Sequence, residues 1–368
     1  MSTPQSQSQF LITELQSLGL RLADPAAGSE GRRGGAGPSD HKAITLGGRT
    51  VMVPVHNDPA RLSPYLADAP DARGISTLAR DGVAVGEIRF PRQPRFYKLQ
   101  TMDGVPYWKI ALLHGADVLA TTVLQTCIRY GARETSCQFC AIGQSLAAGR
   151  TIARKTPEQL AEVARAAVLL DGIRHMVMTT GTPNNRDRGA AILCESAFAI
   201  KAAVPDLPIQ GQCEPPNDPV WFRRMRAAGI DALGMHLEAV TPETRARIMP
   251  GKAKVSLARY LDAFAAAVPV FGRGQVSTYI LAGLGDSPDA ILAMCERLIA
   301  IGVYPFVVPF VPIAGTPLGA HPAPEPAFMR AMLAPLGAML AASGLGSSDI
   351  KAGCGRCGAC SSLQGYER

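Results

Sequence analysis

The pattern of apolar and polar positions along the chain changes near residue 117. Beyond it, short runs with few polar interruptions alternate with longer runs that have amphipathic-helix spacing. Continuous apolar runs are typical of strands buried on both faces, as in a parallel sheet. The pattern predicts strands at 118–125, 173–180, 207–212, 231–237, 275–283 and 303–310, and helices at 156–172, 188–204, 218–229, 256–268 and 287–302.

Six strand–helix repeats indicate an α/β fold but leave its closure open. A full barrel, a partial barrel and an open doubly wound sheet all fit this spacing. The helix at 156–172 is the clearest, since Thr156 can cap it, Pro157 suits its first turn and Gly172 can end it. We expect residues 116–320 to form this α/β domain.

The remaining parts of the chain have weaker patterns. Residues 1–115 are expected to form a small N-terminal α+β region, rich in strands, and residues 321–368 a C-terminal helix and a cysteine-rich tail. Residues 25–40 are rich in Gly, Ser and Pro, so we expect a mobile loop or linker there. Within the N-terminal region, a helix is predicted at 10–19 and strands at 43–48, 50–55, 82–90 and 107–112.

Polar and glycine-rich clusters follow each of the six predicted strands at its carboxyl end. In parallel α/β folds, the carboxyl ends of the strands meet at one edge, and binding sites are built there. The sequence therefore predicts a functional site at this edge. The clusters are a cysteine segment after the first strand and then residues 179–185, 212–218, 236–243, 281–289 and 311–319.

Three cysteines in the first cluster, Cys127, Cys137 and Cys140, follow the pattern C-x9-C-x2-C. A structural zinc site takes four ligands and disulfides take cysteines in pairs. An iron–sulfur cluster can accept three protein thiolates and leave one iron open to a small molecule. The alternative is that Cys137 and Cys140 form half of a zinc site with Cys354 and Cys357, but these pairs lie about 200 positions apart, far beyond the usual spacing of a zinc ribbon.

A second triplet, Cys354, Cys357 and Cys360, lies near the end of the chain as C-x2-C-x2-C among glycines. Glycines allow three thiolates to turn toward one centre, so we favour a second iron–sulfur cluster over zinc or a disordered tail. Without a fourth cysteine nearby, such a cluster has room for an open iron that binds substrate, relays electrons or donates sulfide. The other cysteines are predicted core residues, although one of them follows the third strand: Cys194, Cys213 and Cys295.

Composition narrows the classes of function. The chain is 47% hydrophobic and 18% charged, with a net charge of +7, and its basic residues are scattered, so nucleic-acid binding is not expected. The longest apolar runs contain prolines and are too short to span a membrane. The N-terminus has no export signal and the nine cysteines are odd in number, which predicts a cytoplasmic protein with free thiols or metal ligands.

The cysteine pattern and the strand-end clusters together resemble the radical S-adenosylmethionine (SAM) superfamily. There, a three-cysteine [4Fe-4S] cluster follows the first strand of a partial (β/α)6 barrel, and an aromatic residue, here Phe139, commonly precedes the third cysteine. The usual spacing is C-x3-C-x2-C, and the longer first gap of this chain resembles that of the Elongator catalytic subunit. Over its full length, the chain looks most like bacterial radical enzymes encoded beside nitrilases.

The resemblance implies cofactor contacts at the second and fourth strand ends. Thr180, Gly181 and Thr182 stand where the superfamily binds the methionine amino group through backbone carbonyls, often with the sequence GGE. The segment MHLEA resembles the strand-four motif NHNLD of biotin-synthase-like enzymes, which gives His236 and Glu238 matching places.

Further contacts are implied downstream. Arg259 stands in the region that often supplies an arginine to the methionine carboxylate, and Glu214, like Glu238, can accept hydrogen bonds from ribose hydroxyls. The segment LAGLGDS resembles GIVGLGET, in which Gly283 would let the backbone approach a ligand closely.

The last strand-end segment resembles the part of biotin synthase that packs on adenine, through Val311 and Ile313. The implied residues also have structural alternatives, as capping carboxylates, turn glycines or a buried histidine.

The function implied by the resemblance is that of a radical SAM enzyme. A [4Fe-4S] cluster would reductively cleave SAM to a 5′-deoxyadenosyl radical, which abstracts hydrogen from a small organic substrate. The implied partners are that substrate and an electron donor such as flavodoxin or ferredoxin. The alternatives are a radical SAM enzyme that modifies tRNA and a non-catalytic iron–sulfur electron carrier.

Overall fold

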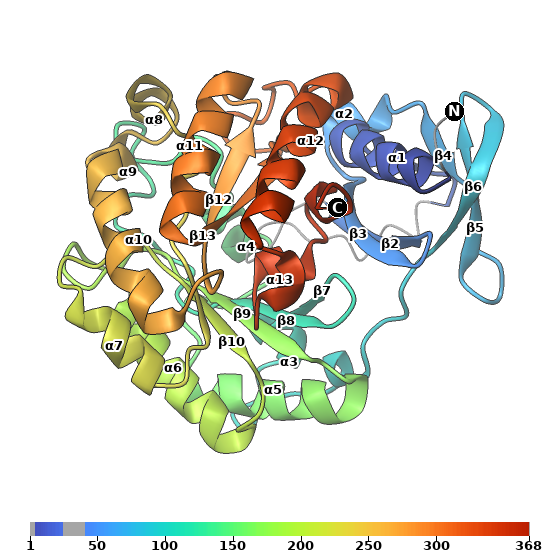
Figure 1. Cartoon of the computed structure of the whole chain (residues 1–368). Coiled ribbons are helices and arrows are strands. Elements are labelled where there is room, and N and C mark those ends of the chain that lie inside the picture. The colour runs from blue at the N-terminus through green and yellow to red at the C-terminus, as the bar shows by residue number, and fades with distance from the viewer. Residues whose placement is uncertain (1–3, 25–40, 368) are drawn as a thin grey trace.

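Two sheets organise the chain in a computed structural model that describes residues 4–24 and 41–367 (Figure 1). The loop expected at 25–40 lies outside the described residues. The smaller sheet has strand order β1-β4-β5-β6-β2-β3 and belongs to the N-terminal region, and the larger has the order β13-β12-β11-β10-β9-β8-β7.

The larger sheet follows the predicted repeats. Strands β8 to β13 pair in parallel in chain order, while β7 pairs antiparallel with β8. The described strands form a partial (β/α)6 barrel. It is open because its edge strands, β7 and β13, do not pair with each other. The fold class is confirmed. The strands are β7 (Leu112–His114), β8 (Val118–Thr122), β9 (His175–Thr179), β10 (Ile209–Gln212), β11 (Ala232–Gly234), β12 (Val276–Ala282) and β13 (Val303–Pro309).

Helices cover the outer face of the barrel sheet (Figure 1). The helix predicted from residue 156 starts with a capping box between Thr156 and Gln159 and ends at Gly172, whose φ of 66° suits glycine. Two short helices between β11 and the next long helix were not predicted. The barrel helices are α4 (Ile142–Ala147), α5 (Pro157–Asp171), α6 (Ala190–Ala203), α7 (Val220–Ala227), α8 (Pro242–Ile248), α9 (Pro250–Ala253), α10 (Leu257–Phe271) and α11 (Pro288–Ile301).

The N-terminal sheet packs on the first helix through a core of its own. Three of its strands, β1, β4 and β5, were not predicted. The elements are α1 (Pro4–Leu18), α2 (Asp58–Arg61), β1 (Arg21–Leu22), β2 (His41–Leu46), β3 (Arg49–Pro54), β4 (Tyr65–Ala67), β5 (Ile75–Arg80) and β6 (Val83–Arg89).

The strand predicted at 107–112 was wrong. Residues Tyr107–Ile110 form the short helix α3, and only the following residues enter β7. Tyr107 and Ile110 are both buried. Their spacing of three fits one face of a helical turn and not the alternation of a strand, so packing overrides the strand preference of the aromatic residues. Since β7 pairs with β8, part of the range 1–115 contributes to the barrel sheet, and the division into three regions stays a prediction.

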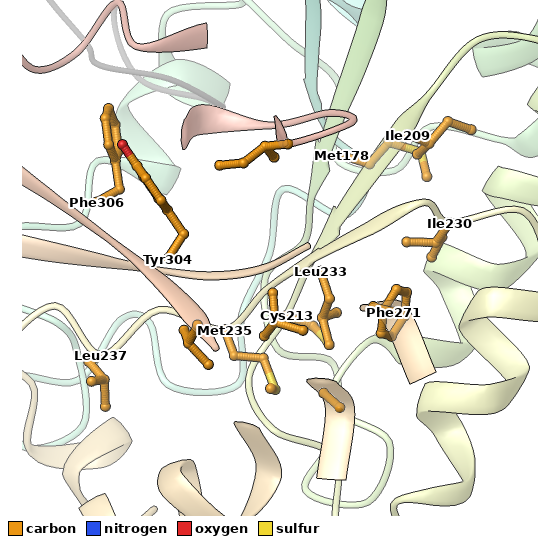
Figure 2. Close-up of a cluster of buried hydrophobic side chains, with 14 of the residues drawn as sticks. Met178, Ile209, Cys213, Ile230, Leu233, Met235, Leu237, Phe271, Tyr304 and Phe306 are labelled. Carbon is orange, nitrogen blue, oxygen red and sulfur yellow. The ribbon is translucent and has the colours of Figure 1, made fainter. Parts of the chain in front are cut away.

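The main core lies between the barrel sheet and its helices. Figure 2 shows Cys213 among Leu233, Met235 and other apolar side chains of this core. Cys213 is 7% exposed, and burial raises the pKa of its thiol to about 12. Its surroundings suit a core residue.

The C-terminal segment lies between the N-terminal region and the barrel (Figure 1). It consists of α12 (Pro326–Ser343) and a tail with the short helix α13 (Cys354–Cys357). Among the described residues, α12 is the one helix long and apolar enough to cross a membrane, with a mean hydropathy of 1.2. Such a signal is weak, since core helices also give it. Buried Met329, Leu333 and Leu336 place one face of α12 in the core.

Candidate active site

The first cysteine triplet lies on the loop between β8 and α4, at the carboxyl end of the first parallel strand. Cys127, Cys137 and Cys140 are each partly buried. The loop is fastened to the segment after β11, because the Gln138 amide donates to the Ile248 carbonyl at 2.7 Å and the Gly251 amide donates to the loop at 3.2 Å. The strand-end geometry that the sequence predicted is therefore present.

Burial governs the acidity of two of these thiols. It raises the pKa of Cys140 to about 11, and it raises that of Cys137 well above the usual range with help from the nearby Glu238 carboxylate. These thiols would stay protonated at neutral pH without a cation, so the environment suits cysteines that lose their protons to a metal centre.

A buried ion pair adjoins the triplet. Arg129 donates from Nε and Nη2 to the two carboxylate oxygens of Glu214, each at 2.7 Å, and Thr182 donates to the same carboxylate at 2.7 Å. Burial opposes ionisation of Glu214, but Arg129, Lys252 and Thr182 together outweigh it and lower its pKa. The backbone N–H of Arg129 lies 3.5 Å from the Cys127 Sγ. Glu214 thus has protein donors on both oxygens, and its expected contact with ribose stays a prediction.

A second ion pair lies at the end of β11. Lys252 Nζ is 2.6 Å from a carboxylate oxygen of Glu238, and both side chains are largely buried. Burial disfavours the charged lysine, but Glu238, with smaller contributions from Tyr260, Glu214 and Cys137, outweighs this effect and raises the Lys252 pKa. Glu238 has a φ of 62°, an unusual conformation for a residue with a side chain, and its backbone bonds with Tyr279 and Leu281 of β12 hold it there.

The neighbouring His236 is neutral. Burial and then Lys252 lower its pKa to about 3, and its Nδ1 accepts a hydrogen bond from the Tyr279 amide at 3.1 Å. It is therefore a polar but uncharged group beside Glu238.

Gly181 has a clear steric reason to be glycine. A Cβ at this position would lie 2.0 Å from the carbonyl oxygen of Thr126, next to Cys127. The segment Thr180–Thr182 and the cysteine loop thus touch through their backbones, and the Gly181 amide donates to Leu124 at 2.9 Å. The contact joins two of the predicted strand-end clusters.

Two other predicted residues make contacts within the protein. Arg259 donates from Nη2 to the carbonyls of Pro216 and Asn217, at 2.8 and 2.7 Å, so it holds the loop after β10. Gly283 has a φ of 100°, and its carbonyl lies 2.9 Å from the His321 Nε2. Their expected contacts with SAM stay predictions.

A cavity of about 310 Å³ opens inside the barrel beside these groups. Five predicted cofactor residues line it, namely Phe139, His236, Glu238, Val311 and Ile313. Its size lies at the lower end of the range for small-molecule sites.

The tail triplet lines the same cavity. Cys354, Cys357 and Cys360 are partly buried there, although the sequence alone could not say where the tail lies. Gln212 Nε2 donates to the Sγ of Cys354 at 3.2 Å, and His114 Nε2 lies 3.2 Å from the Sγ of Cys360.

Neither triplet forms a site for a single metal ion. Within residues 4–24 and 41–367, no three Cys, His, Asp or Glu side chains converge on one ion position. This arrangement disfavours the zinc alternative. It does not bear on a [4Fe-4S] cluster, because there each cysteine binds an iron of its own.

Sequence reasoning missed four polar residues around the two triplets: Arg129, Lys252, His114 and Tyr279. Arg129 carried a signal, since it lies two residues after Cys127. The other three are separated from their cysteine neighbours by long stretches of chain, so their proximity depends on the fold.

Comparisons with known proteins match part of the chain to a family model. Residues 134–298 match the family model of the Radical SAM superfamily, a range that includes Cys137 and Cys140. A bacteriochlorophyllide c C-7(1)-hydroxylase from Chlorobaculum limnaeum is 27% identical over 208 residues, which are 52% of each chain. The present chain thus matches about half the length of this relative.

Solved structures with related folds include two further proteins. A radical SAM methyltransferase from Sphaerobacter thermophilus is 14% identical, with a TM-score of 0.47, over 77% of this chain and 75% of that one. The FeFe-hydrogenase maturase HydG from Carboxydothermus hydrogenoformans is 18% identical, with a TM-score of 0.42, over 59% of this chain and 51% of its own.

This chain contains a radical SAM superfamily domain, and the resemblance seen in its motifs is confirmed. The family implies a [4Fe-4S] cluster and SAM as cofactors.

Proposed function

We propose that this protein is a radical SAM enzyme that acts on a small organic substrate. One observation carries the proposal: the cysteine loop follows β8, and its Phe139 lines the same cavity as His236 and Glu238 from the end of β11. An electron carrier would need the cysteines but would have no use for a cavity of small-molecule size beside them.

The residues present fit the implied cofactors. Cys127, Cys137 and Cys140 lie on one loop and would supply three soft ligands for a [4Fe-4S] cluster. When bound, the cluster supplies the electron that cleaves SAM into methionine and a 5′-deoxyadenosyl radical, which takes a hydrogen atom from the substrate.

The protein's own residues bind and orient the cofactor. Phe139, Val311 and Ile313 provide apolar walls suited to adenine, and Glu238 provides a carboxylate for the ribose hydroxyls. Lys252 holds Glu238 in place through their ion pair. The hydroxylase relative supports chemistry on a small organic molecule. We extend to this chain only the class of substrate, a small organic molecule, and not hydroxylation.

The proposal includes the tail. We assign a second iron–sulfur cluster to Cys354, Cys357 and Cys360. We also propose that the protein is cytoplasmic and receives electrons from an external donor of the flavodoxin or ferredoxin type. The size of the cavity favours a small substrate over tRNA.

The direct test is anaerobic reconstitution with iron and sulfide, followed by incubation with SAM and dithionite. We expect 5′-deoxyadenosine and methionine in equal amounts. Absence of 5′-deoxyadenosine from protein that carries a reduced [4Fe-4S] cluster would refute the proposal.

A further inference from the structure

We infer that the cluster held by Cys354, Cys357 and Cys360 keeps one iron open toward the barrel cavity, and that a substrate nitrogen or oxygen atom ligates this iron. The inference rests on the proposed function, because it gives the tail cluster a task in that reaction. It specifies the substrate class as a small molecule with a donor atom that binds iron.

The first support is the shared cavity. The three tail cysteines line the same space of about 310 Å³ as His236 and Glu238. A molecule bound to the tail cluster would therefore lie in the space next to the proposed SAM contacts. A cluster that only relayed electrons would have no need to face this space.

The second support is that the tail is held firmly in the fold. The Met52 amide and the Gln16 side chain both donate to the Ala359 carbonyl, at 2.8 and 2.9 Å, and Ser361 donates to the carbonyl of Val307 in β13 at 2.6 Å. The N-terminal region and the barrel both form hydrogen bonds with the segment that carries the cysteines. The disordered-tail alternative is therefore wrong.

The glycines around the cysteines lie at positions where the chain packs too closely for a side chain. A Cβ on Gly353 would lie 2.1 Å from the Gln210 side chain, and one on Gly115 would lie 2.9 Å from the Sγ of Cys357. These glycines let the tail approach β10 and the turn before β8 closely enough to bring its sulfur atoms into the cavity.

The third support is a set of hydrogen-bonding groups at the sulfur atoms. Gln212 donates to Cys354 at 3.2 Å, His114 Nε2 lies 3.2 Å from the Cys360 sulfur, and the Tyr279 hydroxyl bonds to Cys360 as well. Gln212 is itself oriented by a 2.7 Å bond to Gln210. Hydrogen bonds of this kind stabilise cluster thiolates and tune the reduction potential of the cluster.

The fourth support concerns the remaining ligand. The chain has nine cysteines, and those outside the two triplets lie elsewhere: Cys194 on α6, Cys213 in the core and Cys295 on α11. His114 is an imidazole in contact with these sulfurs, and its distance from Cys360 is that of a hydrogen bond to sulfur and not of a bond to iron. We therefore assign the fourth ligand position to a molecule in the cavity.

The cavity walls limit what that molecule can be. They are mostly apolar, with contributions from Leu281, Val308 and Phe310, and two of the polar groups that contact the tail sulfurs are the amide of Gln212 and the phenol of Tyr279. The matching ligand is a compact molecule with an apolar body and one nitrogen or oxygen donor.

The test uses the full chain with Cys127, Cys137 and Cys140 all replaced by alanine, so that any cluster belongs to the tail. The probe is [15N]imidazole, read by pulsed EPR of the dithionite-reduced protein. We expect 15N coupling from the probe, and we expect none when the probe is omitted. The Cys295→Ala exchange in the same background is the matched control, since Cys295 lies on α11 outside the cavity, and it should leave the signal unchanged.

Two results would overturn the inference while a tail cluster is present. One is a histidine nitrogen coupling seen without probe in protein labelled with [15N]histidine and lost in His114→Ala, because His114 would then be the fourth ligand. The other is an EPR spectrum that imidazole does not change. If the barrel variant fails to fold, the same probe is added to the unaltered protein saturated with SAM, which occupies the barrel cluster, and the same results decide.

The two proposals fail separately. Formation of 5′-deoxyadenosine by protein with only the barrel cluster's complement of iron would leave the proposed enzyme class intact and remove the tail inference. A tail cluster that binds imidazole in a protein that never cleaves SAM would leave the tail cluster and its open iron intact and refute the proposed enzyme class.

Discussion

The two cysteine triplets contain the same number of sulfur atoms but have different polar neighbours. The barrel triplet adjoins two buried ion pairs, Arg129–Glu214 and Lys252–Glu238. The tail triplet meets an amide, an imidazole and a phenol, from Gln212, His114 and Tyr279. Fixed charges suit a zwitterionic, cationic ligand such as SAM, whereas hydrogen-bonding groups outside any ion pair suit a less polar one. The difference supports the proposal that the triplets serve two different ligands.

The largest effect separates the triplets by activity. Cys127→Ala, Cys137→Ala and Cys140→Ala should each reduce 5′-deoxyadenosine formation to the background of the assay, because each removes a ligand of the cluster that binds SAM. Cys194→Ala on α6 is the control and should retain the activity. Retained cleavage in any of the three variants would remove that cysteine from the proposed ligand set.

Iron content separates the triplets next. Reconstituted protein should hold about eight irons, and the variant with Cys354, Cys357 and Cys360 all replaced by alanine about four, if each triplet holds one [4Fe-4S] cluster. Single replacement of Cys295, a core residue of α11, should leave about eight by the same count. Equal iron in the unaltered protein and the tail variant would mean that the tail holds no cluster.

The charged character of the barrel site can be tested at Glu238. Glu238→Gln should weaken SAM binding about tenfold, a loss of about 1.4 kcal/mol, and leave the iron content unchanged. The reason is that the amide is a poorer acceptor for ribose hydroxyls and no longer pairs with Lys252. Glu243→Gln, at an exposed position on α8, is the matched control. Unchanged affinity, measured by titration calorimetry, would return Glu238 to a structural role.

A smaller effect is expected where the cysteine loop touches the second strand end. Gly181→Ala should destabilise the fold by about 1–3 kcal/mol, because the new methyl group would overlap the Thr126 carbonyl. Gly86→Ala is the control, since a Cβ there meets no atom within 4 Å. Denaturant unfolding measures both. Equal stability of the two variants would show that the two loops separate at little cost.

The barrel was predictable because its strands are short apolar runs joined by helices with clear local signals. The capping box of α5 and the glycine after it are examples that a reader of the sequence can find. The turn at Tyr107–Ile110 was missed because packing decided its conformation. The spacing of the repeats also could not show that the sheet stays open between its edge strands β7 and β13.

The site was predictable only where its residues follow a strand directly. The cysteine loop, His236 and Glu238 have that property. Contacts across the fold had no local signal: His114 and Cys360 are 246 residues apart, and Arg129 and Glu214 are 85 apart. Placement of the tail inside the cavity likewise depends on bonds to Met52 and Gln16 in the N-terminal region, which no pattern in the tail announces.

The central claim is that the barrel triplet holds the cluster that binds SAM. The most direct test is the EPR spectrum of the dithionite-reduced tail variant, with Cys354, Cys357 and Cys360 replaced by alanine, before and after addition of SAM. The account predicts a [4Fe-4S] signal whose g values shift when SAM is added, because the cofactor ligates the open iron of the barrel cluster. A [4Fe-4S] signal that SAM leaves unchanged would contradict it.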